Sequence, residues 1–188
     1  MTKENLTTMT NKLKVPPRPT PDRDSKYMGL ACMMASFSKD PSTQVGSIII
    51  NHDNTPLSWG YNGPPATTPD DSFSWERPEK YQHVIHAEEN AIKHSYVALM
   101  DATMYVSAFP CKRCMELIAK KKVKRIVYLE RVYDSLSMQS RKEDIEESWK
   151  IANDNKLNVE KFVGNVDWLN AWVKELDLIG VFKVINSI

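Results

Sequence analysis

Two short segments of the sequence combine residue types that can bind a metal ion. The first is His86-Ala87-Glu88, and the second is Pro110-Cys111-Lys112-Arg113-Cys114. Zinc prefers imidazole and thiolate donors, and a catalytic zinc takes three protein ligands while one position stays open to water. His86, Cys111 and Cys114 together supply one nitrogen and two sulfurs. The sequence therefore predicts a three-ligand zinc centre.

Glu88 follows His86 by two positions, so it would lie in the first turn of the same helix. A carboxylate beside such a centre can take a proton from water and pass it to a substrate. Zinc assists because it lowers the pKa of a bound water from about 15.7 to about 7. We therefore predict that Glu88 is the proton shuttle, and we interpret its neighbour Glu89 as a solvated helix residue.

A cysteine pair at this spacing also fits other kinds of site. It could be a redox motif or one half of a structural zinc site. A structural site needs a fourth ligand, and Cys32 or His83 could supply it, although neither is paired in spacing with His86. Cys32 lies on the apolar face of an expected helix, where a cysteine behaves as a small core residue. The joint pattern His-x-Glu followed by Pro-Cys-x-x-Cys is more specific than its parts and matches the signature of the zinc deaminases.

Hydrophobic periodicity predicts the elements that must position these residues. Helices that begin at His86 and at Cys111 would start at the same edge of a sheet, and Pro110 suits the first turn of a helix. A helix N-terminus also favours the thiolate form of the cysteines. We expect helices from Asp22 or Asp24 to about Phe37 and over 86–100, 111–122, 140–155 and 166–178, with strands over 45–50, 57–61, 103–108, 125–129 and 159–163.

These elements predict a three-layer α/β/α fold around a mixed five-stranded sheet. The first two strands should form an antiparallel hairpin, and the helix between the last two lets them lie parallel. We expect a flexible Pro-rich tail over 1–23, a zinc-dependent domain over 24–164, and a C-terminal helix and tail over 165–188. Residues 63–82 read as a long loop, and long loops in compact domains are often functional.

Charge and cysteine content argue against three classes of protein: nucleic-acid-binding, membrane and disulfide-rich secreted proteins. The chain has 25 Lys and Arg against 24 Asp and Glu, a formal net charge of +1. This balance argues against nucleic-acid and membrane partners. No apolar run approaches the roughly 20 residues of a membrane span. Three cysteines argue against a secreted disulfide framework, so a cytoplasmic location is expected.

Further motifs extend the match to a known family. They are Ser38-Lys39-Asp40-Pro41, Gln44-Val45-Gly46, Gly60-Tyr61-Asn62-Gly63-Pro64, Asn90-Ala91-Ile92 and Met104-Tyr105-Val106. With them, residues 24–163 resemble the deoxycytidylate deaminases of the cytidine deaminase superfamily. The resemblance implies a cytidine-deaminase-like sheet of strand order 2-1-3-4-5. It also implies zinc-dependent hydrolysis of dCMP to dUMP and ammonia, which feeds thymidylate synthesis.

Two other functions stay open at this point. The same chemistry could act on dCTP, on cytidine, or on a base in RNA or DNA, although the balanced charge argues mildly against the polymers. A non-catalytic zinc-binding module is the alternative from another class. The intact Glu88 argues against that module, because a structural site has no use for an acid there.

The resemblance also assigns individual residues. His86, Cys111 and Cys114 match the zinc ligands, and Glu88 matches the proton shuttle. Substrate contacts are expected from Asn62, Tyr133, Lys39 and the backbone near Ala108. An Asx turn is an equally weighted alternative for Asn62. Arg131 and Arg141 are rivals of Lys39 for the substrate phosphate.

The resemblance also implies how the protein assembles and how nucleotides regulate it. The family is often hexameric, activated by dCTP and inhibited by dTTP, and Mg²⁺ could accompany such a triphosphate. Gly60 and Gly63 resemble part of the effector site. Some relatives bind a second zinc near the 63–82 loop, but this loop has no cysteine and we predict none. The C-terminal apolar stripe would serve assembly or pack on the core; it comprises Trp168, Leu169, Trp172 and Leu176.

Overall fold

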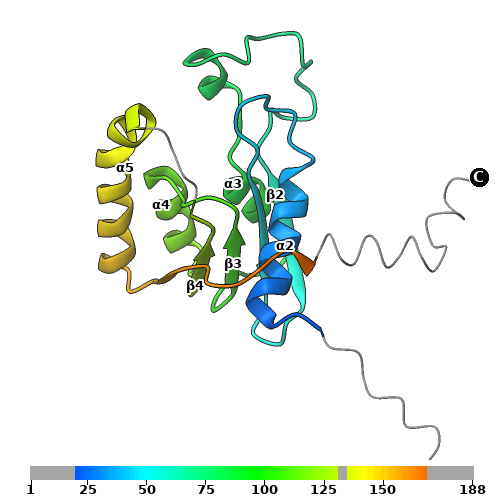
Figure 1. Cartoon of the computed structure of the whole chain (residues 1–188), viewed down its shortest axis with the longest axis vertical. Coiled ribbons are helices and arrows are strands. Elements are labelled where there is room, and N and C mark those ends of the chain that lie inside the picture. Colours follow the sequence, from blue (N-terminus) through cyan, green and yellow to red (C-terminus); the bar gives the residue numbers. More distant parts are fainter. Residues whose placement is uncertain (1–19, 131–134, 169–188) are drawn as a thin grey trace, which may run out of the picture.

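Five strands form one mixed sheet in the computed structural model, which describes residues 20–130 and 135–168 (Figure 1). Their order is β2-β1-β3-β4-β5. Strand β1 runs antiparallel to β2 and β3, whereas β3, β4 and β5 are parallel. The order, the first hairpin and the parallel final pair are therefore confirmed. The bounds are β1 Gly46–Ile50, β2 Pro56–Tyr61, β3 Thr103–Val106, β4 Arg125–Tyr128 and β5 Asn158–Lys161.

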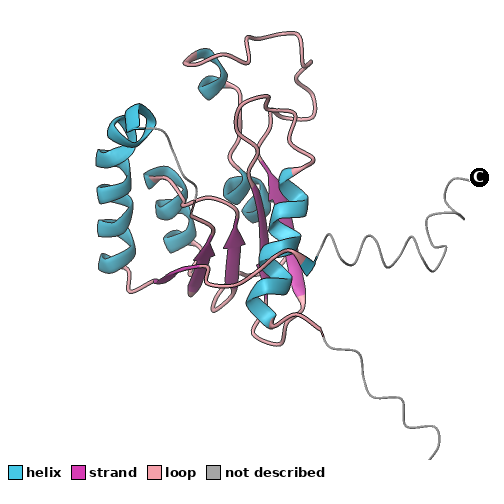
Figure 2. Ribbon diagram, in the orientation of Figure 1, coloured by secondary structure: helices cyan, strands magenta, loops and turns pink. Residues whose placement is uncertain are grey.

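Helices cover both faces of this sheet, which confirms the three-layer arrangement (Figure 2). One face carries α2 (Arg23–Ala35). The opposite face carries α3 (Ala87–Lys93), α4 (Lys112–Lys120) and α5 (Ser135–Asp154), with α5 beside α4 (Figure 1). Within the described residues, no helix combines the length and the apolar character needed to cross a bilayer.

The alternation of side chains along the strands divides the core in two. On β1, Ile48 and Ile50 belong to the cluster beneath α2, and Ile49 belongs to the cluster beneath α3 and α4. Successive residues of a strand point to opposite faces, so a sheet covered on both sides needs apolar residues at every position. The run Ile48-Ile49-Ile50 meets this need, and all three side chains are buried.

The structure corrects two helices and subdivides one loop. The helix expected over 140–155 begins earlier, at Ser135. The helix expected over 86–100 ends at Lys93. Ser95 lies just beyond, where its hydroxyl donates to the Val97 carbonyl at 2.9 Å, and a serine that bonds the local backbone competes with the helical pattern. The 63–82 loop contains a short 3-10 helix, η1 (Glu79–Gln82). The helix expected over 166–178 lies almost entirely outside the described residues.

A charged cluster fastens α2 to the sheet. Arg125, at the start of β4, donates to Asp24 of α2 at 2.6 and 2.8 Å and to Glu160 of β5 at 2.5 Å. The buried Tyr105 of β3 donates its hydroxyl to Asp24 at 2.6 Å. After β5 the chain crosses this face towards α2, and the indole nitrogen of Trp168 donates to the Ser25 carbonyl at 3.1 Å (Figure 1).

This cluster makes stability dependent on pH. Hydrogen bonds from Arg125 hold the pKa of Asp24 below its usual range, so its contribution is present above about pH 4 and is lost as the pH falls through the lowered pKa. We expect Asp24→Asn to lower the free energy of unfolding at pH 7 by about 1–2 kcal/mol, since water partly screens this site. Urea unfolding at pH 7 and at pH 3 measures both effects.

The loss should shrink at pH 3, because the wild-type carboxyl is then partly protonated as well. The exposed Asp71 supplies the control, and Asp71→Asn should leave stability within about 0.5 kcal/mol at both pH values. Equal losses at both pH values for Asp24→Asn would contradict the assignment.

Candidate metal centre and active-site cavity

Two helices deliver the metal-binding side chains from their N-terminal ends. His86 directly precedes α3 and Cys111 directly precedes α4, and both have extended backbone, with φ and ψ of −72° and 155° and of −71° and 167°. Neither side chain caps its own helix, so the imidazole and the thiol are available to a shared point. Cys114 lies three residues after Cys111, which places both sulfurs on the same side of the first turn.

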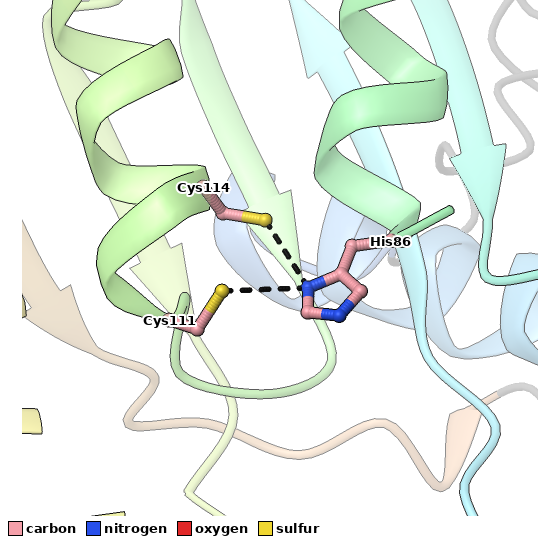
Figure 3. Close-up of side chains that lie close together, drawn as sticks. All are labelled: His86, Cys111 and Cys114. Atoms are coloured by element: carbon pink, nitrogen blue, oxygen red, sulfur yellow. Dashed lines mark hydrogen bonds between the residues drawn. The ribbon is translucent and has the colours of Figure 1, made fainter. Parts of the chain in front are cut away.

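The three donor groups converge in the structure (Figure 3). The sulfurs of Cys111 and Cys114 lie 3.4 and 3.3 Å from Nδ1 of His86, and all three donor atoms lie within 4.8 Å of one another. Zn–S and Zn–N bonds in a tetrahedral site place sulfur and nitrogen roughly 3.5 Å apart. The donor types and their separation therefore fit one zinc ion, and Nδ1 is the imidazole atom directed at it.

The proton affinities of these groups are coupled. Hydrogen bonding with Cys114 and then with His86 lowers the pKa of Cys111 to about 4, against the opposing effect of burial. The hydrogen bond with Cys111 in turn raises the pKa of His86 to about 9. A cation binds the deprotonated thiols and the neutral imidazole, so metal binding would release protons from this cluster.

Glu88 lies in the first turn of α3, and its side chain is 4% exposed. Burial raises the pKa of its carboxyl, while the positive charge of His86 and a hydrogen bond with Cys114 act in the opposite direction. The structure therefore brings the predicted shuttle into contact with the metal-binding cluster. Glu89 does not behave as a freely solvated residue, because it is 9% exposed and pairs with Arg113 at 2.6 Å and with Lys93 at 2.8 Å.

A cavity of about 450 Å³ opens over this cluster. Its volume falls within the range of small-molecule sites. His86, Glu88 and Cys111 form part of its lining, and Ala87, Ala108 and Phe109 add an apolar wall. Four basic residues also line it, namely Arg77, Lys80, Arg113 and Arg141. The cavity could thus hold a flat ring against the metal site and an anionic group against basic side chains.

The other predicted substrate residues fall into three groups. Asn62 and Ala108 line the cavity. Lys39 is an exposed residue that pairs with Asp70, and it is not among the lining residues. Tyr133 and Arg131 lie outside the described residues. Arg141, the second rival for the phosphate, lines the cavity.

The amide of Asn62 is fixed by the backbone of a neighbouring segment. Its Oδ1 accepts from the Val45 nitrogen at 2.7 Å, and its Nδ2 donates to the Thr43 carbonyl at 2.8 Å. The residue is 5% exposed. These bonds join segments distant in sequence, so they differ from the local bonds of an Asx turn.

Gly60 and Gly63 hold the entry of α3 in place. A Cβ at Gly60 would lie 2.4 Å from the Ala91 nitrogen and 2.5 Å from the Ala87 carbonyl oxygen, so only glycine permits this close approach of β2 and α3. Gly63 forms a two-bond bridge with Ile85, directly before His86, at 3.0 and 2.9 Å. An effector role for these glycines stays a prediction.

Two residues of α5 support the cysteine-bearing turn, and the sequence reasoning missed both. Asp144 accepts from the Lys112 nitrogen at 3.2 Å, and the Ser148 hydroxyl donates to the Pro110 carbonyl at 2.8 Å. They lie 32 and 38 residues from their partners. Nothing in the local sequence signals such pairs, because only the packing of α5 on α4 creates them.

The candidate fourth ligands lie elsewhere. His83 stacks on Phe73 with ring centroids 4.6 Å apart, and Cys32 borders a separate shallow hollow. In the described ranges, the metal-binding group that includes His86 has three members. This arrangement favours an open catalytic centre over a closed structural site.

Replacement of one sulfur tests the centre directly. We expect Cys114→Ser to weaken zinc binding by at least about 100-fold, because loss of a mere supporting partner already costs about 10–100-fold. Metal content after dialysis against a chelator, measured by mass spectrometry, reports the change. Cys32→Ser is the control and should retain one zinc per chain. Retention of full metal by Cys114→Ser would exclude it as a ligand.

Comparisons with known proteins agree with this geometry. A family model described as the cytidine and deoxycytidylate deaminase zinc-binding region matches residues 21–130, more than half of the chain. A probable deoxycytidylate deaminase of Caenorhabditis elegans is 40% identical over 113 residues, which cover 57% of each chain. The deoxycytidylate deaminase of Mus musculus is 39% identical over 114 residues, covering 57% of this chain and 64% of the relative. The chain thus matches less than two thirds of the length of these relatives.

A solved structure shares the fold. The dCMP deaminase of the cyanophage S-TIM5, in complex with dCMP and dUMP, superimposes with a TM-score of 0.57 at 22% identity, over 77% of this chain and 100% of that one. The matched residues 21–130 contain all three metal-binding side chains and Glu88. On this evidence the chain belongs to the cytidine and deoxycytidylate deaminase family.

Proposed function

We propose that this protein hydrolyses dCMP to dUMP and ammonia. The observation that carries the proposal is the buried carboxylate of Glu88 beside a three-donor cluster, within a cavity of about 450 Å³. A structural metal site needs neither the acid nor the cavity. Relatives at 39–40% identity bear the name deoxycytidylate deaminase, which supports this substrate over others.

In this mechanism His86, Cys111 and Cys114 hold the zinc ion, which when bound would make hydroxide accessible at neutral pH. Glu88 accepts a proton from the attacking water and delivers it to N3 of the cytosine ring. The water oxygen forms a bond to C4; Glu88 then takes the proton of the new C4 hydroxyl and transfers it to the amino group, so that the C4–N bond breaks, ammonia leaves and the C4 carbonyl of dUMP forms. Burial of the carboxyl keeps bulk water from competing for this proton.

The cavity walls orient the nucleotide. The base lies against the backbone near Ala108 and against Asn62, whose amide is already held in one orientation. A guanidinium can grip a phosphate with two parallel hydrogen bonds, which favours Arg141 over the exposed Lys39 as the phosphate partner. Tyr133 remains a proposed contact to the sugar.

Wider features of the proposal follow the family. We propose that residues 24–164 form the deaminase domain, that the enzyme assembles as a homo-oligomer, with a hexamer favoured, and that it resides in the cytoplasm. We also propose that dCTP, accompanied by Mg²⁺, activates the enzyme and dTTP inhibits it through a site that includes Gly60 and Gly63. Titration of both nucleotides into the activity assay would test this, and a flat response to both would remove it.

Glu88→Gln tests the proton transfer. The amide keeps the shape of the side chain but cannot accept the proton, so kcat should fall by at least about 10³-fold while zinc content stays at one per chain. Loss of cytosine absorbance measures kcat, and mass spectrometry measures zinc. Glu116→Gln alters an exposed residue of α4 and should leave both values unchanged. Substantial turnover by zinc-loaded Glu88→Gln would contradict the shuttle role.

Arg141→Ala tests the phosphate contact. We expect kcat/KM for dCMP to fall by about 10–100-fold, because one charge-assisted contact to the phosphate is lost. Any activity on deoxycytidine, which carries no phosphate, should not change. The same panel with dCTP and cytidine ranks the alternative substrates. Equal losses on dCMP and deoxycytidine would show that Arg141 acts on something other than phosphate.

A further inference from the structure

A buried ion pair lies in the lining of the same cavity as the metal-binding cluster. Lys80 of η1 and Asp40 are 3% and 2% exposed. The Lys80 ammonium donates to both carboxylate oxygens of Asp40, at 2.9 and 2.8 Å, and to the Ser42 hydroxyl at 2.7 Å. An ammonium has three hydrogens to donate, so these contacts satisfy it fully. The mechanism proposed above uses neither charge.

Hydrogen bonds connect Asp40 to other residues that line the cavity. Its Oδ1 accepts from the backbone nitrogens of Ser42 and Thr43, at 2.9 and 3.0 Å. The Thr43 carbonyl and the Val45 nitrogen then hold the two ends of the Asn62 amide. The ammonium of Lys80 is thus connected to Asn62 through one continuous set of hydrogen bonds.

The pair is the buried tie between two segments that also touch at the surface, through the exposed Lys39–Asp70 ion pair and a 3.4 Å hydrogen bond from Arg77 to the Thr43 hydroxyl. Lys80 belongs to the 63–82 loop, and Asp40 belongs to the turn before β1. Both residues line the cavity, as do Thr43, Val45 and Asn62. By contrast, the Gly63–Ile85 bridge holds the entry to His86 independently of Lys80. A change at Lys80 should therefore disturb the substrate wall and spare the metal centre.

We infer that Lys80 and Asp40 are positioning residues for the substrate. The ion pair clamps the 63–82 loop onto the 38–45 segment and so fixes the orientation in which Asn62 meets the base. This inference rests on the proposed function. The competing explanation is that the pair only stabilises the fold, and the two explanations differ in what happens when both charges are removed together.

Removal of one partner leaves a buried charge without its counterion, which destabilises a protein strongly, whereas neutral replacement of both partners is often tolerated. Lys80→Met alone should therefore lower the melting temperature, and the double variant Asp40→Asn/Lys80→Met should restore much of it. In the double variant the amide oxygen can still accept from the 42–43 backbone, and the surface contacts Lys39–Asp70 and Arg77–Thr43 remain, but the buried tie to the loop is gone. Lys80→Arg keeps the positive charge, so its melting temperature and its KM should lie between those of wild type and Lys80→Met.

The experiment compares wild type, Lys80→Met, Lys80→Arg, the double variant and Lys120→Met, an exposed control at the far end of α4. For each full-length protein we would measure zinc content, melting temperature, kcat and KM for dCMP, and hydrogen exchange of the peptide 38–46. In Lys80→Met and the double variant, KM should rise by about tenfold or more, because a small displacement of a positioning group is costly. Zinc content should stay at one per chain and kcat should stay within about threefold.

Exchange of the 38–46 peptide should accelerate by about tenfold or more in both variants, because its anchor is lost. A double variant with restored melting temperature but persistent defects in KM and exchange supports the inference. Recovery of KM together with melting temperature would overturn it, as would an unchanged KM in Lys80→Met. If wild type does not convert dCMP, the proposed function fails, and exchange of the peptide still decides whether the clamp exists.

Discussion

The convergence of two helix N-termini is the constraint on which this molecule depends. Two thiolates and an imidazole can share one metal ion only if their donor atoms lie roughly 3.5 Å apart. These donors come from chain segments 25 and 28 residues apart. The sheet brings the donors together because the segments that lead into α3 and α4 end at the same edge of the sheet. Gly60 then lets α3 approach β2 closely, and α5 supports the turn before α4.

Placing a carboxylate beside these donors has an electrostatic cost. A buried acid surrounded by few hydrogen-bond donors holds its proton more tightly than an acid in water. Burial raises the pKa of Glu88, whereas the buried charges of Lys80 and Asp40 are paired with each other. Functional sites commonly relax such local rules while the surrounding frame keeps its buried charges paired.

The net charge of the chain and the charged residues at the cavity act on ligands of different size. The chain as a whole is close to neutral, with a net charge of +1. The cavity lining holds four basic residues, Arg77, Lys80, Arg113 and Arg141, and three acidic ones, Asp40, Glu88 and Asp144. Net charge governs long-range attraction of large polyanions, whereas a small anionic substrate responds to the few charges within a Debye length of about 8–10 Å. A near-neutral chain therefore offers little long-range attraction to a polyanion, whereas single basic side chains at the cavity can still contact a small anionic group.

Sequence alone determined the strands, their order through the resemblance, and the residues of the metal centre. Those features follow from short-range patterns: apolar runs such as Ile48-Ile49-Ile50, the two cysteines three positions apart, and Glu88 two positions after His86. Only the tertiary structure decided where α3 ends, that Arg141 rather than Lys39 lines the cavity, and that Lys80 finds Asp40. Lys80 and Asp40 are 40 residues apart, and each looks like an ordinary surface charge. Such pairs arise from packing, which places distant segments side by side and leaves no mark on the local sequence of either one.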